Sequence, residues 1–188
     1  MRKFLLPTAV LVLLAPMVSL GQDKMDNPLK NTKVGDFATY RMSSNMGGKD
    51  FAITMKQAIK AKDGNEVTLE TSMNFGGKDL PGKSRKIDFT KPFDITSIMG
   101  EGKANATFEK SADGKEKVKI GDKSYDCVWQ SGKVMSEGPG GMKVETEIKF
   151  WFSPTAPVSG LVKVEAKAEF GGMKTTMTME LSESGNAK

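Results

Sequence analysis

The chain has 188 residues, with 28 Lys and Arg residues against 23 Asp and Glu residues, no His, one Cys and 13 Met. The absence of His excludes Ser-His-Asp and Cys-His catalysis as well as histidine-ligated metal sites. One Cys excludes an internal disulfide and a cysteine-rich zinc or iron–sulfur site. We therefore expect a non-enzymatic protein without a cofactor, and the length is that of a single domain.

The first 21 residues have the organisation of a secretory signal peptide. Arg2 and Lys3 precede an uncharged apolar segment, 4–18, and small residues stand at the −3 and −1 positions before Gln22. The apolar segment is shorter than the ~20 residues that span a bilayer, and Gln22 stands where a lipoprotein would carry Cys. We expect cleavage of 1–21, export to the periplasm or the extracellular space, and no membrane-spanning segment.

Alternation of apolar and polar residues with a period of two dominates the remaining chain and predicts β-strands. In the clearest segments the apolar residues share one face, as in an antiparallel sheet with one solvated face. The predicted strands are 36–45, 50–59, 66–75, 84–90, 105–110, 115–120, 124–130, 143–152, 162–170 and 177–181. The Asp-Gly pairs at 63–64 and 113–114 predict hairpin turns.

These strands predict one all-β domain over residues 22–188. We expect a strongly curved antiparallel sheet or an incomplete barrel of about ten strands, with at most one short helix or lid. The segment 92–100 lacks strand character and is the candidate for that lid, whereas the polar ends, 22–33 and 182–188, are expected to be mobile. The charges are mixed in sign along the chain, which argues against nucleic-acid binding.

The sulfur-containing residues have more than one interpretation. Cys127 shares a strand face with Tyr125 and Trp129, which favours a buried, unreactive thiol over an exposed one that forms an intermolecular disulfide. The chain is also rich in Met, and thioether clusters in exported proteins can bind Cu(I). The candidate copper ligands are Met173, Met177 and Met179. Packing in the core and lining of a flexible apolar pocket are the alternatives.

Aromatic residues at 150–152 are followed by a turn with two prolines, at positions 154 and 157, before the chain resumes as a strand. Because neither proline donates a backbone hydrogen bond, we expect a rigid corner rather than a tight hairpin. This corner closes one end of the sheet or forms the rim of a ligand-binding mouth.

Three short patches together resemble a known group of proteins. They are Val34-Gly35-Asp36-Phe37-Ala38-Thr39-Tyr40, then Tyr125-Asp126-Cys127-Val128-Trp129, and finally Trp151-Phe152-Ser153-Pro154 with Pro157 and Gly160-Leu161-Val162-Lys163. This order resembles exported bacterial β-rich proteins of unknown function that are distantly similar to the LolA/LolB lipoprotein carriers. The resemblance implies a curved antiparallel sheet, a short helical lid and an apolar cavity for acyl chains. Because this chain lacks a long lid helix, the resemblance favours an apolar cavity over lipoprotein transport.

We therefore hypothesise that the protein binds a lipid-like apolar or amphipathic ligand on the apolar face of its sheet. The expected lining residues are Phe51, Ile53, Met55, Leu69, Met73, Phe150, Phe152, Met177 and Met179. Two alternatives are a structural or interaction module of the cell envelope without a small ligand, and methionine-based Cu(I) binding.

Overall fold

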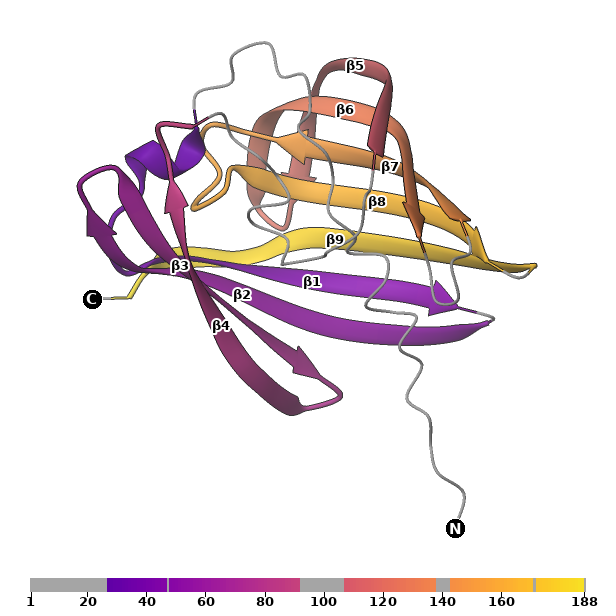
Figure 1. Ribbon diagram of the computed structural model, residues 1–188, viewed down its shortest axis with the longest axis horizontal. Coiled ribbons are helices and arrows are strands. Elements are labelled where there is room, and N and C mark those ends of the chain that lie inside the picture. Colours follow the sequence, from indigo (N-terminus) through magenta and orange to yellow (C-terminus); the bar gives the residue numbers. More distant parts are fainter. Residues whose placement is uncertain (1–26, 47, 92–106, 138–142, 171, 188) are drawn as a thin grey trace.

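The computed structural model describes residues 27–187 except 47, 92–106, 138–142 and 171 (Figure 1). A short 3-10 turn, η1 (Pro28–Asn31), precedes nine strands. The strands are β1 (Asp36–Met46), β2 (Lys49–Asp63), β3 (Glu66–Phe75), β4 (Lys78–Asp88), β5 (Thr107–Ile120), β6 (Lys123–Glu137), β7 (Lys143–Phe152), β8 (Leu161–Phe170) and β9 (Met173–Asn186). Among the described residues no helix is long and apolar enough to cross a membrane.

All nine strands belong to one antiparallel sheet, in the order β4-β3-β2-β1-β9-β8-β7-β6-β5. Strands from the two ends of the described chain, β1 and β9, pair near the middle of this sheet (Figure 1). The all-β antiparallel prediction is confirmed. The sheet is open, with β4 and β5 as its edges, and it is neither closed nor strongly curled, so the strong curvature that we expected is not present. The lid candidate, 92–100, lies outside the described residues.

One predicted turn is wrong, and it explains why about ten strands became nine. The Asp-Gly pair at 113–114 lies inside β5, which continues past it with a bulge between Lys110 and Ala112. Gly114 is opposite Trp129 on β6, and a Cβ at Gly114 would lie 2.8 Å from the indole ring. Glycine is therefore needed here for space next to the indole ring rather than for a turn. The other Asp-Gly pair does mark a hairpin, because β2 ends at Asp63 and β3 begins at Glu66.

The described parts of both polar ends, 27–33 and 182–187, contact the rest of the fold. Asn27 caps η1 through its side chain, and Leu29 within this turn is fully buried. At the other end, β9 continues to Asn186, which pairs with Asp36 of β1. Leu29 anchors the first segment by its apolar burial, and the backbone pairing with β1 holds the last one. The predicted cleavage site and the rest of 1–26 lie outside the described residues.

Most of the core lies on one face of the sheet, which we call the inner face and define by Tyr40, Met55, Leu69, Phe150 and Met179, all of them fully buried. The predicted corner packs against it: the Ser153 amide donates to the Gly160 carbonyl at 2.8 Å. The Tyr40 hydroxyl lies 3.0 Å from the Ser159 hydroxyl and donates to the Leu161 carbonyl at 3.3 Å. The corner is thus tied to the core by buried polar contacts, and burial raises the pKa of Tyr40 far above its ordinary value.

Candidate functional site

The predicted lining residues all lie on the inner face, but they differ in exposure. Most of them are buried in the core, namely Met55, Leu69, Phe150, Phe152, Met177 and Met179. Within this group the Phe150 ring packs between those of Phe108 and Phe152, with ring centroids 6.1 and 6.2 Å away. A close-packed side chain of this kind stabilises the fold and offers little surface to a ligand.

The remaining predicted residues, Phe51, Ile53 and Met73, are only half-buried and lie together on β2 and β3. Ile53 is opposite Phe75 in the register, and the Phe51 and Phe75 rings stack with centroids 6.5 Å apart. Leu80 of edge strand β4 is opposite Met73 and is 46% exposed. We call these five residues the apolar strip: Phe51, Ile53, Met73, Phe75 and Leu80.

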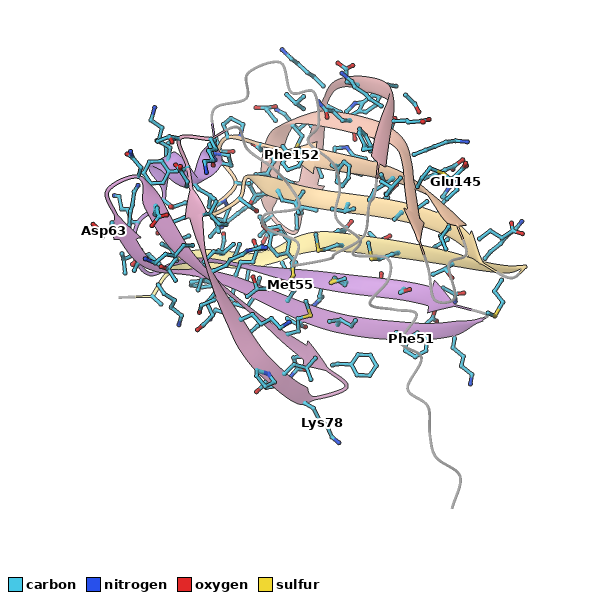
Figure 2. All side chains as sticks on the ribbon, in the orientation of Figure 1. Phe51, Met55, Asp63, Lys78, Glu145 and Phe152 are labelled. Atoms are coloured by element: carbon cyan, nitrogen blue, oxygen red, sulfur yellow. The ribbon has the colours of Figure 1, made fainter. Side chains whose placement is uncertain are left out.

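The apolar strip is continuous with the core. Met55, which follows Ile53 on the same face of β2, is opposite Met73 and is fully buried. Exposure then rises along β2 and β3 towards the end of the sheet where Phe51, near the start of β2, and Lys78, at the start of β4, are found (Figure 2). The fully buried end fixes the geometry of the strip, and the half-exposed end leaves apolar surface that a ligand could cover.

Two members of the strip were missed among the predicted lining residues. Phe75 lies in the predicted strand 66–75, two residues after Met73 and on the same face, so the alternation alone could have identified it as a lining residue. Leu80 was missed because Pro81 and Gly82 follow it, and we expected the next strand to begin only at residue 84. In the structure β4 begins at Lys78, and its proline is tolerated because β4 is an edge strand.

The opposite, outer face carries charged side chains around tryptophan. The Trp151 indole donates to the Glu116 carboxylate, and the Lys149 ammonium lies 4.4 Å from the Trp151 ring centroid and 4.1 Å from that of Trp129. Lys163 also forms a salt bridge with Glu180, with an N–O distance of 3.0 Å. Trp151 is only 4% exposed on this face, so the cluster is a satisfied structural assembly in which charged side chains cover an aromatic ring.

Two open pockets lined by described residues also lie on the outer face. One, of about 260 Å³, is lined by β6, β7 and β8 residues such as Lys133, Glu147 and Glu165. The other, of about 440 Å³, lies beside Val34, Phe37 and the exposed Lys56 and Lys60. Their walls carry mixed charges and do not include any predicted lining residue, so we do not place the ligand there.

Cys127 has the environment of an unreactive thiol. It is 3% exposed, and its Sγ donates to the Tyr125 carbonyl at 3.5 Å. Burial raises the pKa of the Cys127 thiol to about 11. Since the thiolate is the reactive form, this thiol is a poor nucleophile near neutral pH.

The methionines proposed as copper ligands do not share one environment. Met177 and Met179 are buried in the core at 4% and 0% exposure, whereas Met173 is 49% exposed at the start of β9. Within the described part of the chain there is also no group of three or more Cys, Asp or Glu residues placed to hold a metal ion. The methionines on β9 are therefore best described as core side chains with one exposed neighbour.

No protein-family model and no curated protein matches this chain. Two solved structures have a similar fold. One, from Bacteroides fragilis, is described as a "putative exported protein with YmcC-like fold"; the TM-score is 0.53 at 11% identity, covering 82% of this chain and 97% of the other. The second, a "putative lipoprotein" from Parabacteroides distasonis, has a TM-score of 0.53 at 10% identity and covers 86% of this chain and 100% of the other.

At this level of identity the similarity concerns the fold alone. The resemblance to exported bacterial β-rich proteins is confirmed at the level of architecture. The relationship to the LolA/LolB carriers is not tested by these matches and stays a prediction.

Proposed function

We propose that the protein is a non-enzymatic, exported protein that binds an apolar or amphipathic ligand on the apolar strip. The observation that carries the proposal is the exposure of Leu80 and the half-exposure of Phe51, Ile53, Met73 and Phe75 on a face whose remainder is a packed core. An exposed apolar patch continuous with a core is typical of a binding surface. The fold neighbours, described as exported or as a lipoprotein, support the exported setting.

The binding mode is burial of an acyl-type chain along β2, β3 and β4. Such a chain would lie across Phe51, Met73 and Leu80 and remove their apolar surface from water, which is worth roughly 25 cal/mol per Å². The flexible Met73 thioether can adapt to chains of different shape. The affinity that comes from burying the apolar chain does not require specific polar contacts.

The experiment is a titration with the neutral apolar dye N-phenyl-1-naphthylamine, followed by displacement with decanol. We expect dye fluorescence to rise on addition of protein and to fall again as decanol displaces the dye. A protein that binds neither dye nor decanol at micromolar to millimolar concentration contradicts the proposal and favours a structural or interaction module. Bovine serum albumin serves as the positive control for the dye and for decanol.

A further inference from the structure

The charges on the β2–β4 part of the inner face have one sign. Side chains alternate between faces along a strand, and the register places Lys49, Lys78 and Lys83 on the same face as the apolar strip. Arg85 and Lys62 share this face. Lys62 lies at the far end of β2 from the strip, and its ammonium donates hydrogen bonds to the carbonyls of Lys30 and Thr32 at 2.7 and 2.9 Å.

All carboxylates of these three strands lie on the outer face. They are Asp50, Asp63, Glu66, Glu70, Asp79 and Asp88, and the register alternates each of them with an inner-face residue. The lysines that pair with them also lie on the outer face. Lys60 forms a salt bridge with Glu70 at 2.9 Å, and Lys86 lies 3.8 Å from Glu66. The outer face of these strands therefore carries six carboxylates and three lysines, Lys56, Lys60 and Lys86, whereas their inner face carries only cationic charges.

Three of the inner-face lysines are spread along the apolar strip. Lys78 is directly opposite Phe75, Lys83 is opposite Thr71 next to the Met73–Leu80 pair, and Lys49 precedes Phe51 by two residues on the same face. All three are exposed, and among the described residues none of them makes an ion pair. Directly opposed Cα atoms in an antiparallel sheet are about 5 Å apart, so the Lys78 ammonium group can reach a head group that lies over Phe75. Lys49 and Lys83 lie about 13 Å from Lys78 along the strand direction, one on each side.

We propose that this cationic rim selects an anionic amphiphile, with the apolar chain on the strip and its negatively charged head group beside Lys78, which has Lys49 and Lys83 on either side of it along the strand direction. The proposal rests on the proposed function and adds the chemical class of the ligand. It is supported by charge complementarity, because the ammonium groups of β2–β4 have no carboxylate of these strands beside them on the inner face, which favours an anion and disfavours a cation. The proposed ligand is a single amphiphile molecule rather than a membrane surface, because the exposed apolar surface is confined to the five residues of the strip and ends at the fully buried Met55.

The test compares decanoate, decanol and decyltrimethylammonium, all below their micelle concentrations, as competitors of N-phenyl-1-naphthylamine. We expect decanoate to bind about tenfold more tightly than decanol, and the cationic amphiphile to bind more weakly than both. At about 0.5 M NaCl the advantage of decanoate should shrink, because the lysines are exposed and are screened.

Two matched triple variants locate the effect. K49Q/K78Q/K83Q should lower decanoate affinity to that of decanol and leave decanol affinity unchanged. K56Q/K60Q/K86Q removes the same number of charges from the outer face of the same strands and should change neither affinity. A loss of decanoate affinity that is equal in both variants overturns the proposal, because net charge alone would then explain it.

The remaining outcomes separate the two proposals. If decanol and decanoate bind equally, the head-group proposal fails while the apolar-binding proposal stands, and Lys78 and Lys83 serve only to protect edge strand β4. If neither amphiphile displaces the dye because nothing binds, the proposed function itself fails. Binding to phosphatidylglycerol vesicles without binding of monomeric decanoate overturns the single-molecule ligand in favour of a membrane surface.

Discussion

Replacing Phe150 with Ala should lower the free energy of unfolding by about 3–5 kcal/mol, the range measured for truncation of buried aromatic side chains. Phe150 is fully buried, and its ring packs between those of Phe108 and Phe152. The surrounding strands β6 and β8 pair with β7 on both sides and cannot close around the cavity. The measurement is equilibrium unfolding in urea, with Phe150→Leu expected to recover most of the loss.

Phe51→Ala is the matched control for this prediction. Phe51 is an inner-face phenylalanine of the same predicted set, but it is half-buried and stacks on Phe75. We expect a loss of about 1–2 kcal/mol because part of its surface is already in contact with water. If Phe150→Ala costs no more than Phe51→Ala, Phe150 lines an open space and our separation of core from strip is wrong.

The double substitution Phe51→Thr/Leu80→Thr should weaken binding of decanol and of the neutral dye about thirtyfold. Each side chain is half-exposed, and covering the rest is worth about 1 kcal/mol per residue, or about 2 kcal/mol for the pair. Threonine retains a high β-propensity, so strands β2 and β4 should persist. The measurement is the dye titration, together with urea unfolding to confirm that the double variant is folded.

Val34→Thr is the control for the double variant. Val34 is 55% exposed, more than Leu80, but it lies beside the pocket on the outer face. Its replacement should leave dye and decanol affinity unchanged. Equal weakening by Val34→Thr would indicate nonspecific binding to exposed apolar residues rather than binding on the strip.

The one-sided strands and most of the core could be predicted because each depends on neighbours within its own segment. The alternation in 66–75 and 143–152 defines the inner face without knowledge of the partners, and the Asp63-Gly64 turn follows from local backbone preference. The same reasoning failed at Gly114, since its role is to leave space for Trp129 on the next strand. A contact between strands cannot be seen in the local pattern.

The division of the candidate site into core and strip also depends on long-range structure. Met55 and Phe51 lie on the same face of β2, yet Met55 is fully buried and Phe51 is half-exposed. Their difference arises from position along the sheet, because Met55 lies in the well-packed centre and Phe51 lies near the first residue of β2, at the end of the sheet (Figure 2). The cationic rim was missed for a related reason. The sequence places lysines on both faces, and Lys83 is assigned to the inner face only by the pairing of β4 with β3, whose register shifts between Thr71 and Met73.

The most direct measurement is NMR of protein labelled with ¹³C in the methionine methyl groups, titrated with decanol. Met73 lies in the strip, whereas the half-buried Met135 is on β6, opposite Glu145 on the outer face. Our account predicts that the Met73 methyl resonance shifts in proportion to the fraction of protein bound, that Met55 responds less, and that Met135 does not move. A saturable shift of Met135 with Met73 unchanged, or decanol binding that moves neither, would contradict the account.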